Sequence, residues 1–399
     1  MVKHLIAIFV IYVAATVAWL ILGGTLFERT ARQDTKLKGK VASMWGGEQV
    51  QKAPSACLKT PTEKPDVFKT TALPLTSTRS EVRLELDRRR KGLLWYNTFA
   101  VRFGGTYVFE NTSPDAGKVT VRFPLPAEKA VYDDIVFVVN GAPMAYGDGG
   151  SALTAEIDAA PGSKITLHAG YRSQGMDKWS YSFGSGVEPV RDFVLAAHTS
   201  FRDIDFEDNT LPPSEKRERD GGWDLEWRYK NLLTGANVAI AMPEALQPGP
   251  LAAEISLFAP VSLLFFFFVM LLFTALKNVE LHPVNYFFLA AAFFSFHLLF
   301  AYTVDHISLP AAFAIASLVS VFLVISYLRL VVGMRFAAVE AGLAQLVYLV
   351  LFSAAFFVKG FTGLTVTIGA IVTLFVAMQL TGRIRWAERF VPRPPQTAI

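Results

Sequence analysis

The sequence contains few of the residues from which cross-links, metal sites and active sites are built. Only one of its 399 residues is cysteine, Cys57, and six are histidine. A single cysteine excludes an intrachain disulfide and any metal site made of several cysteines, so we interpret Cys57 as an unpaired thiol. The G-x-S-x-G, H-E-x-x-H, Walker and kinase patterns are also missing from the sequence. We therefore expect a protein that is not an enzyme and that holds no metal and no cofactor.

Charged side chains are scarce too, at 18% of the chain compared with about 25% in an average soluble domain. The net charge is only +4, and no basic stretch is interleaved with aromatic residues in the way that a nucleic-acid surface requires. The chain is instead apolar, since 52% of its residues are hydrophobic and 33 are phenylalanine. We therefore exclude nucleic acid as a partner and expect a lipid bilayer to solvate part of the chain.

Six apolar stretches are long enough to cross a bilayer, because a hydrocarbon core of about 30 Å needs roughly 20 apolar residues in a helix. The stretches are 5–22, 255–276, 283–304, 309–328, 336–358 and 361–380. The first is long for the apolar core of a signal peptide and is followed by no small-x-small cleavage site, so we interpret 1–28 as an uncleaved anchor. The other five predict a helical bundle at 253–386, followed by a tail at 387–399.

Lysine and arginine in the short loops indicate the orientation, because these residues stay preferentially in the cytoplasm. Six crossings place both termini on one side, which carries Lys3, Lys277, Arg329, Arg335, Arg383, Arg385, Arg389 and Arg393. The short loops of the opposite side carry only Lys359. Both termini are therefore predicted to be cytoplasmic. A basic run after the first helix argues for the opposite orientation; it consists of Arg29, Arg32, Lys36, Lys38 and Lys40.

A polar insert between the first and second helices, 29–252, shows the alternation of apolar and polar residues that is typical of strands. The stretches EVRLELD, KVTVRF and DLEWRYK carry this pattern. Many short strands of this kind predict an antiparallel sandwich with one buried and one solvated face. The segment 30–44 is more helix-like. The predicted fold class is thus a membrane α-helical bundle of one plus five transmembrane helices with an all-β, sandwich-like extracytoplasmic domain, which the orientation places in the periplasm.

Several stretches of the chain resemble one known family. They are ERTARQD and SMWGGEQ after the first helix, FAPVSLLFFF entering the second, and LHPVNYFFLAAAFFSFHLLFAYTVDHISLPAAFAIAS in the third and fourth. These stretches, and the layout of one helix, a large polar domain and a helical bundle, resemble the CreD family of bacterial inner-membrane proteins. The resemblance implies an inner-membrane location and a link to envelope integrity and envelope-stress responses. It implies no catalytic residues.

The turn between the second and third helices carries Glu280 and His282 just before Pro283. Two residues apart on a helix, their side chains would point roughly 200° away from each other, so they are badly placed to act together. A metal site would need further ligands, and at ~1.5 Å rise per residue His297 lies roughly 22 Å further along the helix. We interpret both residues as parts of an interfacial turn, with a functional group as the alternative.

Four further polar residues lie at membrane depth or at helix ends, where ionisable groups are costly and often functional. His297 is expected to be a neutral imidazole that is hydrogen-bonded to a neighbouring helix. Glu340 is expected to pair with Arg335. The alternative for His297 and Glu340 is a role in a proton or ion path. Asp305 and His306 are assigned to an interfacial loop.

A basic run in the polar domain consists of Arg88, Arg89, Arg90 and Lys91. Aromatic residues follow it directly, at Trp95, Tyr96 and Phe99. We interpret the run as a charged hairpin turn. The alternative is a surface that binds an anionic headgroup or polymer.

Two functions fit these observations. The first is a non-enzymatic envelope protein whose periplasmic β domain binds an envelope component or a periplasmic or membrane protein. The second is a small-solute or proton-coupled transporter or channel that uses His297 and Glu340. The five consecutive C-terminal spans show no repeat of two related halves, which disfavours a transporter. The sequence leaves the oligomeric state open.

Overall fold

The computed structural model describes most of the chain: residues 2–61, 68–91, 94–128, 130–145, 150–184, 186–204, 206, 208–277, 279–358 and 360–382. Part of the orientation signal and the predicted tail fall outside the described residues, namely Lys359, Arg383, Arg385, Arg389, Arg393 and 387–399. The chain divides into two compact units, each described separately below. They are the membrane unit (Met1–Gln33, Gly92–Leu94 and Leu246–Ile399) and the β unit (Asp34–Lys91 and Trp95–Ala245).

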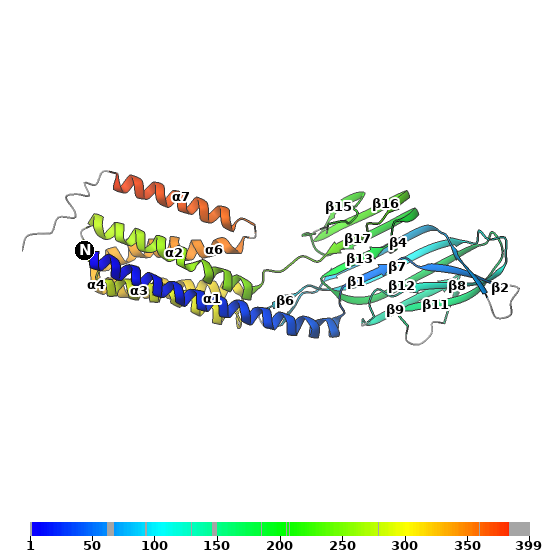
Figure 1. Cartoon of the computed structure of the whole chain (residues 1–399), viewed down its shortest axis with the longest axis horizontal. Coiled ribbons are helices and arrows are strands. Elements are labelled where there is room, and N and C mark those ends of the chain that lie inside the picture. Colours follow the sequence, from blue (N-terminus) through cyan, green and yellow to red (C-terminus); the bar gives the residue numbers. More distant parts are fainter. Residues whose placement is uncertain are drawn as a thin grey trace, which may run out of the picture. The chain divides into compact units, whose positions relative to one another are not determined.

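The membrane unit is helical. Among the described residues, six helices are long and apolar enough to cross a membrane, which confirms the predicted number. Five of them are single elements: α1 (Val2–Trp45), α2 (Pro248–Lys277), α3 (Pro283–Thr303), α4 (Leu309–Val332) and α7 (Thr362–Thr381) (Figure 1). The remaining span lies between α4 and α7 and is the fifth in chain order. It is composite and consists of η1 (Phe336–Ala341), α5 (Gly342–Gln345), η2 (Leu346–Leu351), α6 (Phe352–Ala354) and η3 (Ala355–Phe357). The elements η1 and η2 are π-helical.

Helix α1 is longer than predicted. It is one helix of 44 residues, whereas the sequence suggested an anchor ending at 28 and a separate helix-like segment at 30–44. No proline interrupts it, and the lysine, arginine and glutamine residues that follow the apolar stretch are good helix formers. The helix therefore continues beyond the end of the apolar stretch. Within the membrane part, Gly23 allows α2 to approach closely, since an added Cβ would lie 2.7 Å from the Leu257 side chain.

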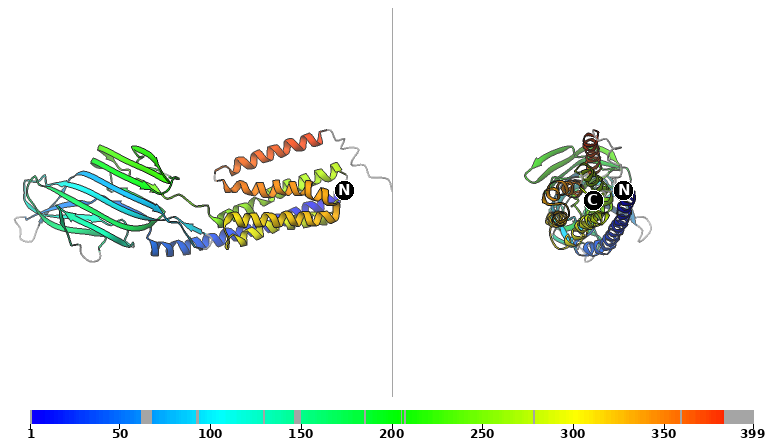
Figure 2. Two further views of the ribbon diagram at one scale, coloured as in Figure 1. Left: turned by 180° about the vertical axis from the view of Figure 1, so that it is seen from behind. Right: turned by 90° about the vertical axis from the view of Figure 1, so that its left-hand side faces the viewer.

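Aromatic rings and small residues fill the inside of the bundle, in which α1 to α4 run lengthwise beside one another (Figure 2). Phe293 of α3 packs on Phe266 of α2, with ring centroids 5.1 Å apart. The Ser320 hydroxyl of α4 donates a hydrogen bond to the carbonyl oxygen of Ala292 on α3 at 2.6 Å. Such contacts matter in lipid, because apolar burial alone gives little net gain between helices there.

The strands of the described residues form four sheets. The largest has eight strands in the order β10-β9-β12-β7-β4-β14-β16-β15. Its strands are β4 (Leu75–Leu86), β7 (Thr98–Glu110), β9 (Tyr132–Val139), β10 (Ala142–Pro143), β12 (Lys164–Met176), β14 (Glu188–Thr199), β15 (Glu215–Arg219) and β16 (Gly222–Thr234).

The other three sheets are smaller. A four-stranded sheet has the order β11-β8-β2-β3, with β2 (Ser55–Pro61), β3 (Phe68–Leu73), β8 (Gly117–Pro124) and β11 (Ala152–Ala159). A three-stranded sheet has the order β1-β13-β17, with β1 (Gln49–Lys52), β13 (Lys178–Ser182) and β17 (Val238–Ala241). A two-stranded sheet pairs β5 (Arg89–Lys91) with β6 (Leu94–Tyr96).

Two strand pairs depart from the predicted antiparallel arrangement. Most neighbouring strands are antiparallel, but β4 pairs with β14 and β1 pairs with β13 in parallel. A parallel pair needs a long crossover connection, and all the strands from β5 to β13 lie between β4 and β14 in the chain. Alternation in the sequence specifies which face of a strand is buried. It does not specify which distant strand becomes the neighbour, and for this reason the prediction was wrong at these two pairs.

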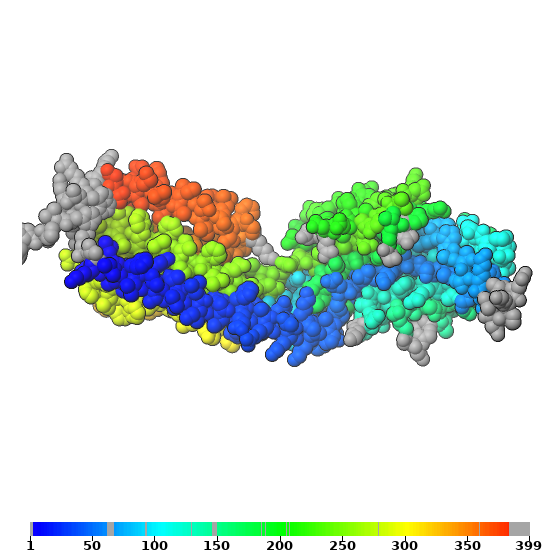
Figure 3. Space-filling model, viewed as in Figure 1, coloured from blue at the N-terminus to red at the C-terminus, as the bar shows by residue number. Residues whose placement is uncertain are grey.

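One hydrophobic core joins the larger sheets of the β unit. Phe103 of β7 stacks on Phe123 of β8 with ring centroids 6.3 Å apart, and its ring lies 6.1 Å from that of Trp179 on β13. The inner faces of the eight-, four- and three-stranded sheets therefore meet around these rings. In the space-filling view, the green surface of β14 to β16 and the teal surface of β8 to β11 form different sides of this unit (Figure 3).

The same alternation that builds the core places polar residues on the outer face of the eight-stranded sheet. Along β4, Val82 and Leu84 are buried, whereas Glu81 and Arg83 are exposed. Successive side chains of a strand point to opposite faces of the sheet. The outer face is therefore where charged groups of neighbouring strands come together.

Candidate functional site

A concavity of about 830 Å³ lies on the outer face of the eight-stranded sheet, and we name it the trough. Strands β4, β7, β9, β12 and β14 provide its lining. Its charged side chains and its histidine are Arg79, Glu81, Arg83, Arg102, Asp134, Arg172 and His168. Because all of these residues belong to the β unit, the trough is contained in one compact unit.

Glycine makes the floor of the trough. Gly104 of β7 lies opposite Gly170 of β12 on one side and opposite Glu81 of β4 on the other. Two neighbouring strands thus lack a side chain at the same level, which leaves the backbone open to close approach. A Cβ added to Gly104 would meet nothing within 4 Å, so this glycine borders open space.

The adjacent glycine, Gly105, is needed for a different reason. Its missing side chain would point toward the core, where an added Cβ would lie 2.8 Å from a ring carbon of Tyr107. Tyr107 is completely buried. Gly105 therefore makes room for the core, and Gly104 makes room for the trough.

Three arginines stand side by side along one wall. Arg102 of β7 lies directly opposite Arg172 of β12 and directly opposite Arg83 of β4. Directly opposite residues have Cβ atoms about 4.5–5.5 Å apart, and like charges at such positions destabilise a sheet. Arg172 also lies directly opposite Asp133 of β9, so the unfavourable like-charge contacts are those of Arg102 with its two arginine neighbours.

The three arginines differ in how they are compensated. The Arg83 Nε donates to Glu81 Oε1 at 2.9 Å. Arg102 and Arg172 are exposed, and no carboxylate of the described residues lies within ion-pairing distance of either. Two adjacent guanidinium groups thus remain available to an anion.

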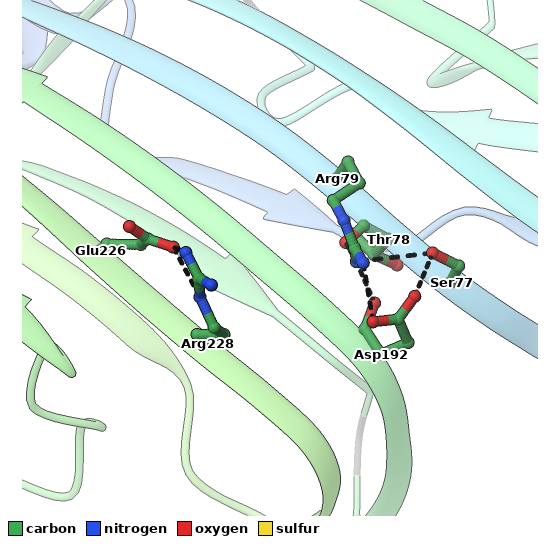
Figure 4. A network of polar contacts seen from close by, with 6 residues as sticks. All are labelled: Ser77, Thr78, Arg79, Asp192, Glu226 and Arg228. Carbon is green, nitrogen blue, oxygen red and sulfur yellow. Dashed lines mark hydrogen bonds and ion pairs between the residues drawn. The ribbon is translucent and has the colours of Figure 1, made fainter.

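The opposite wall contains Arg79, which is held in place by β14 (Figure 4). Its guanidinium donates to Asp192 Oδ1 at 2.7 Å and to the Asp192 carbonyl oxygen at 2.6 Å. The Ser77 hydroxyl donates to Asp192 Oδ2 at 2.8 Å. The hydrogen bond from Arg79, together with that from Ser77, lowers the pKa of Asp192. Arg79 is therefore oriented and largely neutralised, unlike Arg102 and Arg172. Glu226 and Arg228 form a similar ion pair along β16 (Figure 4).

Two histidines lie on the same sheet. The Nδ1 of His168, in the wall of the trough, lies 2.9 Å from the Thr106 hydroxyl. His198 of β14 lies between two carboxylates, with Nδ1 2.6 Å from Asp224 Oδ1 and Nε2 3.5 Å from Glu81 Oε1. The hydrogen bond from His198 lowers the pKa of Asp224. Among the described residues, these groups do not form a cluster that could hold a metal ion.

The sequence carries two signals of the trough. Arg79, Arg83, Arg102 and Arg172 each occupy an outward position of an alternating strand, and a glycine pair interrupts the strand pattern in FAVRFGGTYVF. A glycine inside a strand often marks a close approach of backbone or ligand. What the sequence did not contain is the pairing of β4, β7 and β12 that brings the arginines together.

His297 is buried in the membrane unit. Its Nδ1 lies 3.1 Å from the Phe293 carbonyl oxygen, one turn earlier on the same helix. The predicted hydrogen bond to a neighbouring helix is therefore replaced by one within α3. The side chain of α1 that reaches it is aromatic: the Trp19 ring lies 5.5 Å away, edge to face. The backbone carbonyl satisfies the imidazole locally because a residue four positions earlier lies on the same helix face.

Glu340 pairs with Lys277 and not with Arg335, so that prediction was wrong. The Lys277 ammonium at the end of α2 forms an ion pair with Glu340 Oε1 of η1. Glu340 is buried whereas Arg335 is exposed, so the two side chains occupy different faces of the fifth span. In the described residues, no contact joins Glu340 to His297, and the structure does not bring these two candidates together.

Asp305 also has a partner. Its Oδ2 accepts from the Arg29 guanidinium of α1 at 2.7 Å. The ion pair links the turn after α3 to the part of α1 where the unexpected basic run begins. His306 belongs to the same turn, and its backbone N–H donates to the Thr303 carbonyl oxygen at 2.9 Å.

His282 caps helix α3. Its Nδ1 accepts from the Val284 N–H at 3.3 Å, and Pro283 follows it at the first turn. Its ring also lies 5.8 Å from that of His4. Glu280 is exposed, and no hydrogen bond or ion pair among the described residues joins it to His282. The turn is thus capped in an ordinary way, and the functional alternative for these two residues stays untested.

The basic run in the β unit has local partners. Arg88 donates to the Pro243 carbonyl oxygen at 2.9 Å. Arg89 pairs with Asp87 and lies over the Trp45 ring, 4.4 Å from its centroid. Arg89, Arg90 and Lys91 form β5, which pairs with β6, as a charged hairpin requires.

Comparison with known proteins identifies a family for part of the chain. The family model described as "Inner membrane protein CreD" matches residues 205–387. The match includes FAPVSLLFFF and the stretch that begins LHPVNYFF, and it confirms the resemblance that these motifs indicated. The trough lies outside the matched residues. A search of curated proteins finds no match.

Two solved structures show weak similarity. One is a candidate nutrient-binding protein from Legionella pneumophila, with 10% identity and a TM-score of 0.32 over 48% of this chain and 69% of that chain. The other is an M1 zinc metallopeptidase from Deinococcus radiodurans, with 11% identity and a TM-score of 0.24 over 42% of each chain. At these TM-scores neither similarity indicates a fold or a function.

Proposed function

We propose that this chain is a CreD-type inner membrane protein, non-enzymatic and multi-pass, that contributes to envelope integrity or to the envelope-stress response, and the family model that matches residues 205–387 supports this proposal. Its β unit, in which we propose that the two larger sheets form a sandwich, binds an envelope component or a protein partner. The membrane unit anchors this binding function in the bilayer.

The proposed orientation places both termini in the cytoplasm and residues 29–252 in the periplasm, between an anchor at 1–28 and a bundle at 253–386. Two contacts within the membrane unit support a consistent arrangement of its ends. The His4 and His282 rings lie 5.8 Å apart, so the start of α1 and the turn before α3 are neighbours. The ion pair between Arg29 and Asp305 joins the opposite ends. It also partly compensates the basic run whose charge opposes this orientation.

The trough is the observation that carries the proposal. Its wall places Arg102 and Arg172 directly opposite each other without a carboxylate partner among the described residues, at a cost to the sheet. A surface that is unfavourable for folding and open to solvent is typical of a binding site. The sequence lacks the G-x-S-x-G, H-E-x-x-H, Walker and kinase patterns.

A complementation experiment tests the proposal. Cells that lack the protein are given the wild type, Arg102→Gln with Arg172→Gln, or the matched control Arg122→Gln, an exposed arginine of the four-stranded sheet. Survival in detergent with EDTA measures envelope integrity, and immunoblotting confirms equal protein amounts. We expect the double variant to lose protection and the control to keep it. Full protection by the double variant would contradict the proposal.

The same assay separates this proposal from a transporter that uses His297 and Glu340. A transporter predicts that His297→Leu and Glu340→Gln abolish protection at unchanged protein amounts. Our proposal predicts that His297→Leu has little effect, because its described contacts are a backbone carbonyl and aromatic rings. Glu340 is already paired with Lys277, which makes it a poor proton carrier.

A further inference from the structure

We propose that the trough binds a phosphorylated organic ligand, with a phosphate ester between the Arg102 and Arg172 guanidinium groups and the uncharged part of the ligand over the glycine floor. This inference rests on the proposed function, because it names the class of ligand that the β unit recognises. Nothing about the membrane unit enters the argument.

The charge of the trough favours an anion. Four arginines line it against two carboxylates, Glu81 and Asp134, which leaves a net charge of +2 when His168 is neutral. Arg83 is paired with Glu81, and Arg79 is held by Asp192 outside the lining. Among the charged lining groups this leaves Arg102, Arg172 and Asp134, a net charge of +1, and the two adjacent guanidinium groups attract an anion such as a phosphate monoester, which carries about −1.5 to −2 at pH 7.

The arrangement of the two free guanidiniums favours phosphate over a carboxylate. A single guanidinium already satisfies a planar carboxylate through two parallel hydrogen bonds. Arg102 and Arg172 stand on neighbouring strands and present two donor groups whose Cβ atoms are about 4.5–5.5 Å apart. A tetrahedral phosphate offers oxygens to both at once, and clusters of arginine are a common means of binding phosphate groups.

The size of the trough requires more than an inorganic ion. Its volume of about 830 Å³ is in the range of pockets for whole small molecules, about 300–1,000 Å³. Gly104 and Gly170 provide a floor without side chains next to the arginine wall. Beyond the floor, the Thr106 hydroxyl and His168 form a polar pair at 2.9 Å that can hydrogen-bond to a second part of the ligand.

The test uses the full chain in phosphatidylcholine nanodiscs and isothermal titration calorimetry at constant ionic strength. The probes are glycerol 3-phosphate as a soluble ester, dihexanoyl-phosphatidylglycerol below its micellar concentration as a lipid headgroup, and inorganic phosphate and sulfate as simple anions. We expect at least one ester to bind, and to bind at least tenfold more tightly than sulfate. Which ester binds more tightly distinguishes a soluble source from a lipid source.

Two variants locate the binding. Arg102→Gln with Arg172→Gln should weaken ester binding at least tenfold, whereas the control Arg122→Gln should leave it unchanged. Gly104→Val should also weaken ester binding while leaving the binding of inorganic phosphate unaltered, since the added side chain enters open space above the floor. Circular dichroism checks that each variant is folded.

The outcomes separate the inference from the proposed function. If neither ester binds the wild type, or if the double variant binds esters as well as the wild type, the phosphate inference is overturned. Loss of protection in cells by the same double variant would then still support recognition through the trough of a different ligand. If ester binding depends on the arginines but the cells remain protected, the inference stands and the proposed function fails.

Discussion

The membrane unit and the outer face of the β unit differ in how their charged side chains are paired. In the membrane unit, Glu340 is paired with Lys277 and Asp305 with Arg29. On the β unit, Arg102 and Arg172 stand beside each other without an acidic partner among the described residues. An unpaired charge is costly in lipid, so pairing is expected there whatever the function. In water nothing forces two arginines together, so their juxtaposition is the more informative observation.

The largest effect should come from breaking the pair in the membrane unit. Lys277→Met leaves the Glu340 carboxylate, whose side chain is 10% exposed, without its partner. We expect the free energy of unfolding to fall by about 2–3 kcal/mol. This is less than the ~3–5 kcal/mol lost when a fully buried ion pair is broken, because the Lys277 side chain is half exposed. Thermal unfolding in detergent measures it. Arg335 is the partner of Glu340 that the sequence predicted, and Arg335→Met should have almost no effect on stability. Equal losses of stability in Lys277→Met and Arg335→Met would refute the observed pairing.

The second effect compares the two glycines of β7. Gly105→Ala forces a Cβ against the buried Tyr107 ring and should cost about 1–3 kcal/mol, as overpacking usually does. Gly104→Ala points into the trough and should be close to neutral. Thermal unfolding of the full chain, followed by the circular dichroism of the strands, gives both values. Similar melting temperatures for the two variants would mean that the assignment of inner and outer faces is wrong.

A smaller effect should depend on pH. The hydrogen bond from Arg79 lowers the pKa of Asp192 in the folded state. The ionised carboxylate therefore stabilises the folded state at pH values above the ordinary pKa of aspartate, near 4. This stabilisation is lost as the pH falls through the lowered pKa of the folded state. Both side chains are about half exposed, so the pair should contribute less than about 1 kcal/mol. The difference in stability between the wild type and Asp192→Asn should therefore be present at pH 7 and should disappear in acid. A difference that grows in acid would contradict this sign.

The smallest effect should be a gain in stability. Arg102→Gln removes the repulsion from Arg172 and Arg83, so the free protein should become more stable by about 0.2–1 kcal/mol. The gain should shrink at high salt, which screens exposed charges. Thermal unfolding at low and high salt measures it. A clear loss of stability instead would indicate that Arg102 serves the fold and not a ligand.

The sequence predicted the features that depend on local pattern. The number of membrane helices followed from the length of the apolar stretches, and the buried faces of strands such as β4 followed from alternation at Val82 and Leu84. The continuation of α1 to Trp45 was missed as a single helix, because hydropathy measures contact with lipid and not helical structure.

The features that depend on distant contacts could not be predicted. Arg83, Arg102 and Arg172 lie on three strands that are far apart in the chain, and only the register of β4, β7 and β12 makes them neighbours. The choice of Lys277 as the partner of Glu340 likewise depends on how α2 packs against η1. The sequence favoured Arg335 because it is close to Glu340 along the chain, whereas Lys277 is close to Glu340 only in the folded structure.

The location of the β unit is the central claim, and Cys57 reports on it directly. This lone cysteine lies in β2 and is partly exposed. Intact spheroplasts are treated with a membrane-impermeant maleimide, with permeabilised and denatured samples as controls. We predict labelling in the intact spheroplasts, which would place the β unit in the periplasm. Labelling only after permeabilisation without denaturation would place the β unit in the cytoplasm and would contradict the proposed function.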